Sequence, residues 1–291
     1  MSALTAAIRR IPGAIRLRRI IGYAEHAWSL RTSERRNYLF TQFCRLPTQN
    51  QTLAGPVVDF LRPDPQDELR IVVFGCSIGA EPYSIASVLR TVRPALRFRL
   101  ECYDIEPEVV ARAQSARYTT TEISTGNVTQ EFIERTFDAA EAGDAMLVKP
   151  AIAERVRFLL GNVLDRSLVD RLGQADVVVA QNFLYHLPRP QAEQAFRNLF
   201  ALLKPRAALL VDGTDLDMRA RLTAEAGLEP CTIALERIHE ESRLLRGYVW
   251  PRVYWGLEPF DARRSDAVRR YATIFLRSEH AGVRSPAASA T

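Results

Sequence analysis

The sequence predicts an α/β fold in which a mostly parallel sheet carries helices on both faces. Strand-like and helix-like segments alternate between about residues 70 and 215, which is the order of βαβ units. The segment "ADVVVAQN" is apolar over several consecutive positions, as expected of a strand buried on both faces. The expected strands lie at residues 70–74, 98–104, within 155–165, at 175–182 and at 207–213.

The same pattern divides the chain into regions. Residues 1–65 are expected to form a short helical N-terminal region, and residues 66–215 the α/β domain. Residues 119–154 break the alternation and predict a small inserted unit. Residues 216–280 are expected to complete the sheet and to add an aromatic-rich extension, and residues 281–291 a disordered tail.

Composition and charge exclude several classes of protein. No apolar run approaches the roughly 20 residues that cross a membrane, so membrane insertion is not expected. Arginines are spread through the start, "MSALTAAIRRIPGAIRLRRI", which does not resemble a secretory signal. The formal net charge is +5, but acids are interspersed with the arginines. This distribution argues against nucleic acid as a partner, and the sequence leaves the oligomeric state open.

The cysteines and histidines predict no metal site. No two cysteines form a CxxC pair, and the scattered histidines lack acidic neighbours at metal-ligand spacing. We therefore expect reduced thiols in a cytoplasmic protein. The cysteines are Cys44, Cys76, Cys102 and Cys231.

The stretch "IVVFGCSIGAEPYSIASVLR" (71–90) contains the first candidate ligand site. An apolar strand ends at Gly75, a turn with Ser77 and Gly79 follows, and Glu81 stands at the start of a helix. Ligands of open parallel sheets bind beyond the carboxyl ends of the strands, where glycines allow close approach. An acid there would repel a pyrophosphate but would suit the ammonium and sulfonium groups of S-adenosylmethionine. The charge pattern therefore favours that nucleoside over a dinucleotide.

Asp104 ends the second expected strand, where an acid can accept hydrogen bonds from both ribose hydroxyls. A structural alternative also exists for this pair of features. Gly75 and Gly79 would then only shape a tight loop, and Asp104 would only cap the helix "PEVVARAQ".

Several motifs, in order, resemble the chemotaxis-receptor glutamate methyltransferases, the CheR family. "FGCSIGAEPYSIA" is similar to the family pattern G-C-S-T-G-E-E-P-Y-S-I-A, and the similarity continues through "YDIEPEVVARAQSARY", "VRFLLGNVLD" and "DVVVAQNFLYHLPRPQ". The resemblance covers about residues 70–215. It implies the Rossmann-like fold of class I methyltransferases, with S-adenosylmethionine as cofactor and S-adenosylhomocysteine as product.

The resemblance also implies roles for residues of the first turn. Gly75, Ser77 and Gly79 would line the methionine part of the cofactor. Glu81 matches the second of two family glutamates, while Ala80 replaces the first.

Further along the chain, the resemblance implies that Asp104 binds the ribose and that Asn162 and Val163 flank the adenine. Gln181 and Asn182 match an Arg-Asn pair beside the transferred methyl group. Gln181 thus stands where the family has arginine.

Two departures from the family pattern concern the active site. The family has a segment near N-x-T-x-F-F-R before the first strand, whose arginine reaches the active site. We place its counterpart in "NQTLAGPVVDFLRP", which has little similarity to that pattern. The role of the family arginine is therefore not assigned to Arg62. Where the family has tyrosine and phenylalanine, this chain has His186 and Leu187.

His186 is the candidate that bears on mechanism, together with Asn182 and Tyr185 beside it. A carboxylate acceptor is already ionised at neutral pH and needs no base, whereas a hydroxyl acceptor needs one, and histidine is suited to that role. The alternative is that His186 only packs against the following helix.

Three functions follow, of which the sequence favours the first and keeps the other two as alternatives. The first is S-adenosylmethionine-dependent O-methylation of a small molecule, which the lost arginine and the gained histidine favour. The second is methylation of a protein carboxylate, as in the receptor enzymes, which the family motifs favour. The third is a non-catalytic module that binds the cofactor as a sensor or scaffold.

Overall fold

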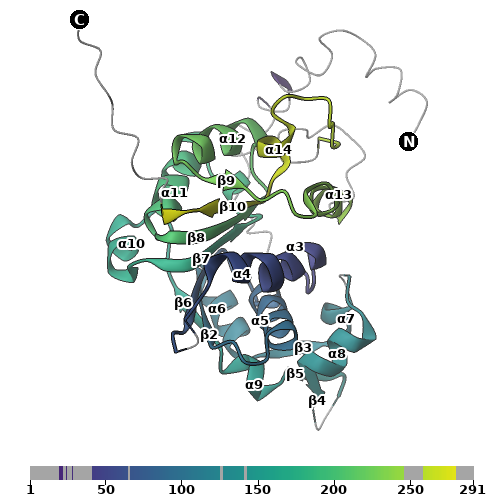
Figure 1. Cartoon of the computed structure of the whole chain (residues 1–291). Coiled ribbons are helices and arrows are strands. Elements are labelled where there is room, and N and C mark those ends of the chain that lie inside the picture. Colours follow the sequence, from purple (N-terminus) through teal and green to yellow (C-terminus); the bar gives the residue numbers. More distant parts are fainter. Residues whose placement is uncertain are drawn as a thin grey trace, which may run out of the picture.

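The computed structural model describes residues 20, 21, 24, 28, 41–64, 66–124, 127–140, 143–245 and 258–279. In this part of the chain, seven strands form one sheet in the order β6-β2-β1-β7-β8-β10-β9, and three short strands form a second sheet (Figure 1). The predicted α/β fold with a mostly parallel sheet is confirmed. The strands of the large sheet are β1 (Leu69–Phe74), β2 (Phe98–Asp104), β6 (Val156–Leu160), β7 (Ala175–Gln181), β8 (Leu203–Asp212), β9 (Glu229–Pro230) and β10 (Ile274–Arg277).

The first five of these strands in the sheet are parallel to their neighbours. β1 pairs in parallel with β2 and β7, β2 with β6, and β7 with β8. β10 runs antiparallel to both β8 and β9, and β9 is the edge strand on that side. All five parallel strands therefore end at the same edge of the sheet.

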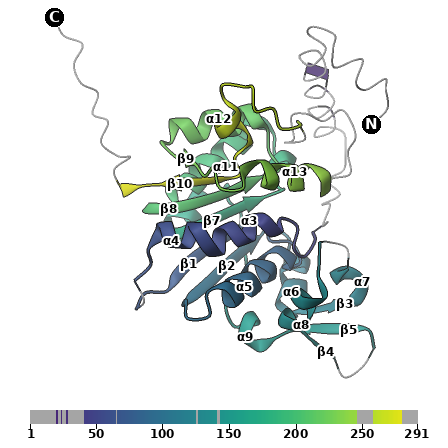
Figure 2. The ribbon, with the colours of Figure 1, turned by 45° about the vertical axis from the view of Figure 1, so that its right-hand side comes forward.

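Each strand residue packs on the face that the period of two assigns to it. Ile71 and Val73 of β1 belong to one apolar layer, and Val72 and Phe74 to the other. The first layer is covered by η1, α4, α5 and α6, and the second by α10, α11 and α12. Figure 2 shows α4 and α5 on one side of the sheet and α11 and α12 on the other. Because both faces are covered, the central strand β7 and most of β1 are apolar without alternation, as the valines of β7 predicted. β2 still alternates at its start, where Arg99 is exposed.

The helices of the described residues fill the connections between strands. In chain order they are α3 (Pro47–Thr52), η1 (Leu53–Val57), α4 (Val58–Leu61), α5 (Ala80–Val92), α6 (Pro107–Gln114), α7 (Thr120–Ile123), α8 (Gln130–Thr136), α9 (Pro150–Ala153), α10 (Arg166–Leu172), η2 (Leu184–His186), α11 (Arg189–Ala201), α12 (Leu216–Glu225), α13 (Leu235–Leu245) and α14 (Ala267–Tyr271).

A small antiparallel sheet lies in the part of the sequence that breaks the alternation. It consists of β3 (Arg117–Thr119), β5 (Ala145–Val148) and β4 (Phe137–Ala139), with β5 in the centre. Phe43, from the segment before α3, packs edge-on against Tyr118 and Phe137, with ring centroids 4.9 Å and 5.2 Å apart. The segment before the first strand is thus tied to this unit. The division of the chain into regions stays a prediction.

Several aromatic residues and histidines of the sequence lie outside the described residues, namely Tyr248, Trp250, Tyr254, Trp255, His26 and His280. Phe260 is described and packs against Tyr271, with ring centroids 5.0 Å apart. His239 is buried and its Nε2 lies 2.6 Å from the carbonyl oxygen of Glu258. His239 therefore packs in the core.

Two negative findings apply to the described ranges alone. None of their helices is both long enough and apolar enough to cross a membrane. Within the same residues, no three side chains of His, Cys, Asp or Glu gather in a way that could hold a metal ion.

A buried arginine ties α14 to the rest of the C-terminal region. Arg270 has only 2% of its side chain exposed and lies 2.7 Å from Glu258 Oε2, while its Nη1 donates to Asp217. Tyr271 donates to Glu258 Oε1 at 2.8 Å. Removing one partner of a buried pair leaves the other charge uncompensated, so this contact is sensitive to truncation.

We expect Arg270→Ala to lower the free energy of unfolding by about 3–5 kcal/mol, because Glu258 would stay buried without its partner. Denaturant titration followed by circular dichroism measures this loss. Arg264→Ala is the matched control, since its pair with Asp266 is partly exposed and such pairs contribute less than about 1 kcal/mol. Equal losses in the two variants would contradict the assignment.

Candidate functional site

The turn after β1 is built from residues with left-handed backbone angles. Gly75, Ser77 and Gly79 have φ values of 70°, 48° and 91°. A Cβ on Gly75 would lie 2.6 Å from Phe183 Cδ1, and one on Gly79 would lie 2.8 Å from Phe158 Cζ. Both glycines are therefore required by backbone angle and by space. The two glycines thus shape the loop, and this role is compatible with a ligand that lies over the turn.

Asp104 joins this turn to the end of β2. Its Oδ2 accepts a hydrogen bond from the backbone N–H of Ser77 at 2.8 Å, and its Oδ1 accepts one from Ile105 at 2.8 Å. The N-cap residue of α6 is Glu106, whose side chain makes no capping bond. Asp104 is thus a bridge between two loops at the carboxyl edge rather than the cap of α6.

Glu81 lies in the first turn of α5 and is a half-buried carboxyl group. Burial raises its pKa to about 7; the positive charge of Arg45 acts against this rise, and the negative charge of Asp212 adds to it. A carboxyl group that ionises reluctantly is stabilised in its charged form by a cation. The electrostatics at this point therefore favour a positively charged ligand.

The family arginine that sequence analysis did not find is best matched by Arg45. Residues 41–45 read "TQFCR", which fits the end of the family pattern, T-x-F-F-R, except at Cys44. Arg45 is close enough to Glu81 to act on its pKa, whereas Arg62 is exposed at the end of α4. The segment after residue 49, in which we placed the counterpart, fits the pattern less well. The spacing of Thr41, Phe43 and Arg45 was the signal that could have located it.

The residues expected around the adenine lie past the end of β6. Asn162 is exposed and its Oδ1 accepts a hydrogen bond from Leu164 N at 2.9 Å. Val163 is buried, and its carbonyl oxygen accepts one from Asn198 Nδ2 at 2.7 Å. These two residues form a fixed turn one strand away from Asp104.

Two exposed aliphatic side chains at the same edge were missed by the sequence analysis. Leu160 pairs in register with Asp104, and Ile105 follows Asp104 directly. Their exposed fractions are 59% and 51%. Large apolar side chains exposed beside polar groups are typical of ligand sites, and a flat base would cover them.

The residues expected near the transferred methyl group gather at the end of β7. Gln181 is buried; its Nε2 donates to Gln49 Oε1, and its own Oε1 is buried without a partner among the described residues. Asn182 has a φ of 60°, and its N–H donates to the carbonyl oxygen of Asp212 at 3.0 Å. Gly213 packs on Asn182 so closely that a Cβ would lie 2.7 Å from its Cα.

Tyr185 and His186 follow in η2 and are both half-buried, with ring centroids 3.9 Å apart. The chain therefore places Gln181, Asn182, Tyr185 and His186 within one short segment after β7. This segment directly follows the carboxyl end of β7, which is parallel to β1. It therefore lies at the same edge of the sheet as the first turn.

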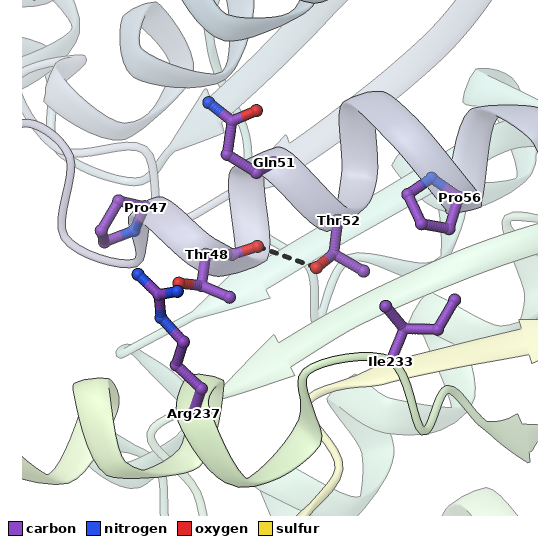
Figure 3. A pocket seen from close by; sticks show the side chains of 7 residues that line it. All are labelled: Pro47, Thr48, Gln51, Thr52, Pro56, Ile233 and Arg237. Carbon is purple, nitrogen blue, oxygen red and sulfur yellow. Dashed lines mark hydrogen bonds between the residues drawn. The ribbon is translucent and has the colours of Figure 1, made fainter.

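Two surface hollows of the described residues lie elsewhere. One, of about 340 Å³, runs between α3 and the start of α13 (Figure 3). Another, of about 630 Å³, lies between α13 and α14. None of the predicted site residues lines either hollow.

Comparison with known proteins gives a family match. Residues 39–224 match the model described as "CheR methyltransferase, SAM binding domain". The chain is 32% identical over 167 residues to the probable biofilm formation methyltransferase WspC of Pseudomonas putida, covering 57% of this chain and 38% of that protein. It is 28% identical over 172 residues to the chemotaxis protein methyltransferase Cher2 of the same species, covering 57% of this chain and 61% of that protein. The chain thus spans less than two thirds of the length of these relatives.

Among solved structures, the chain is similar to magnesium protoporphyrin IX methyltransferase from Synechocystis with bound SAM. The identity is 15% and the TM-score 0.35, with 75% of this chain and 87% of that chain covered.

The raised pKa of Glu81 predicts pH-dependent binding of S-adenosylmethionine. Because Glu81 ionises near pH 7, its charged fraction rises about tenfold between about pH 6 and pH 8. We expect the affinity for S-adenosylmethionine to rise by up to about that factor over this interval. Calorimetric titration at several pH values measures it.

Glu81→Gln is the control for this prediction, because it keeps the size of the side chain and removes its titration. It should weaken binding and flatten the part of the pH profile that belongs to Glu81. Without ligand, stability should fall as pH rises from about 4.5 to about 7, since the folded state holds the proton more tightly than the unfolded chain. A wild-type profile identical to that of the variant would refute the role of Glu81.

Proposed function

We propose, from the premise that the chain belongs to the family of CheR methyltransferases, that it transfers a methyl group from S-adenosylmethionine to a carboxylate side chain of a protein. The observation that carries the cofactor part of this proposal is the acidic edge formed by Glu81 and Asp104 over the glycine turn. Both relatives described above are named as methyltransferases, one of them as a chemotaxis protein methyltransferase. That likeness supports the acceptor part of the proposal.

The residues present suit the cofactor. Asp104 has carboxylate oxygens at the end of β2, where ribose hydroxyls can donate to them. Glu81 gains from a nearby cation, because burial and Asp212 disfavour its charged form. Leu160 and Ile105 offer exposed apolar surface for a base. When bound, S-adenosylmethionine supplies a methyl group attached to a positively charged sulfur.

The chain's own residues would mainly bind, orient and exclude water. A carboxylate acceptor is ionised at neutral pH, with a reference pKa near 4, and so needs no base. Arg45 is the cation of the described residues that acts on Glu81, and it would offset the repulsion between an anionic acceptor and the acids of this edge. Alignment and close approach then account for the rate.

A second candidate keeps the same cofactor and changes the acceptor to a hydroxyl group of a small molecule. The observation that favours it is His186, which replaces a family tyrosine and lies against Tyr185. The sequence alone ranks this candidate first. The family match and the names of the relatives favour the protein carboxylate instead.

The two acceptors give chemically different products. We expect incubation with methyl-labelled S-adenosylmethionine and a purified chemoreceptor signalling domain to label the protein, with release of volatile methanol in mild alkali. A methyl ester hydrolyses under those conditions, whereas a methyl ether does not. Alkali-stable label would rule out the carboxylate. Binding of the cofactor with no label on receptor domains or on phenolic and alcoholic small molecules would identify a non-catalytic module.

His186→Ala separates the candidates by mechanism. For a carboxylate acceptor we expect turnover to fall by less than about tenfold, because no proton has to be removed. For a hydroxyl acceptor, loss of a general base should cost about 10²–10⁴-fold. The measurement is kcat with saturating cofactor, and His186→Gln controls for loss of side-chain volume.

A further inference from the structure

The first turn of α3 has no cap of its own. Pro47 is the first helical residue, and the preceding residue, Leu46, has no side chain that could accept a hydrogen bond. Backbone N–H groups in the first turn of a helix lack partners within the helix. The missing acceptor comes from another part of the chain.

Glu241 of α13 supplies it. The backbone N–H of Thr48 donates to Glu241 Oε2 at 3.2 Å, and the hydroxyl of Thr48 donates to Glu241 Oε1 at 2.5 Å. Arg237, one turn earlier on α13, also contacts Glu241, with Nε 3.2 Å from Oε1. Figure 3 shows Arg237 extending from α13 toward Thr48 across the hollow between the two helices.

The residue after Thr48 connects this cap to the methyl end of the site. Gln49 is fully buried; its Oε1 accepts a hydrogen bond from Gln181, and its Nε2 donates to Thr273 Oγ1 at 2.8 Å. The first turn of α3 therefore fixes the direction of the Gln181 amide. A displacement of α3 would therefore also displace the side chain at the end of β7.

The residue after Glu241 makes the parallel contact on the neighbouring strand. Ser242 donates to Asp212 Oδ2, and Arg219 Nη1 lies 3.5 Å from Asp212 Oδ1. Asp212 pairs in register with Gln181. Consecutive residues of α13 thus reach the ends of β7 and β8, one through α3 and one directly. α13 lies beyond the residues that the family model matches.

We propose that Glu241 is a positioning residue for the methyl end of the site, acting through Thr48 and Gln49 on Gln181. The proposal rests on the proposed function, because Gln181 is taken to face the reacting group. α13 then holds two adjacent strand ends in fixed relation. Small displacements of aligned groups are costly in rate and in affinity, so the cap affects a site that it does not touch.

A double-mutant cycle tests this coupling. The affinity for S-adenosylmethionine is measured by calorimetry for the wild type, Gln181→Ala, Glu241→Ala and the double variant. We expect about tenfold weaker binding for Gln181→Ala and about fivefold for Glu241→Ala, the effect of losing one hydrogen bond or one helix cap. The double variant should bind no more weakly than Gln181→Ala, because both changes disable the same contact.

Two further variants exclude a general effect on folding. Glu241→Gln keeps an acceptor for Thr48 and should bind within about twofold of the wild type. Arg237→Ala removes a side chain that is 75% exposed and should leave affinity unchanged, since exposed pairs contribute little. The proposal would be overturned if the affinity losses of the two single variants multiplied in the double variant. It would also be overturned if Arg237→Ala and Glu241→Ala lost affinity equally.

Hydrogen exchange gives a measurement that needs no ligand. In Glu241→Ala, the rate of amide exchange should increase both in residues 48–52 and at the end of β7. In Arg237→Ala it should increase in neither segment. An increase confined to α3 would overturn the proposal. If the wild type binds no S-adenosylmethionine, the proposed function fails, while the exchange result still decides whether Glu241 controls the position of Gln181.

Discussion

The parallel register of β1 with β2 and β7 is the constraint on which the candidate site depends. Parallel strands end at one edge, so residues far apart in the sequence meet there without any local signal that joins them. The register pairs Phe74 with Tyr103 and with Ala180. The turn at Gly75 and the acid Asp104 follow these positions directly. The hydrogen bond from Ser77 N to Asp104 Oδ2 then fixes the turn against the second strand.

The acids at this edge differ in how well their negative charge is already compensated by partners. Asp212 is buried, but each of its oxygens has a partner: Ser242 donates to Oδ2, and Arg219 lies near Oδ1. Asp104 accepts backbone N–H groups on both oxygens. Glu81 is opposed by Arg45 and disfavoured by burial and by Asp212. Among these acids Glu81 is therefore the one whose ionised form would gain most from a cationic ligand.

Sequence reasoning located the parts of the site that carry a local pattern. The glycine turn, Glu81 and Asp104 were found because a strand, a sharp turn and a helix follow one another in a short stretch. Arg45 was missed because the family pattern was sought in the next segment, although "TQFCR" preserves its spacing. Leu160 and Ile105 were not identified because an exposed aliphatic residue has no distinctive neighbours in sequence. Their register with Asp104 appears only once β2 and β6 are paired.

The contacts of Gln181 show why the remainder could not be predicted. Its partner Gln49 lies 132 positions away in the sequence, and the partner of Thr48 lies 193 positions away. Neither glutamine belongs to a repeating pattern, so only the folded chain brings them together. The environment also explains why glutamine is tolerated where the family has arginine. Gln49, which accepts from Gln181, and Thr273, which accepts from Gln49, are neutral. The neighbouring Asp212 is already paired with Arg219, so a buried guanidinium in place of the amide would need a further anion. Under the proposed function, and with a neutral amide at this position, Arg45 would supply positive charge for the carboxylate acceptor, since it acts electrostatically on Glu81.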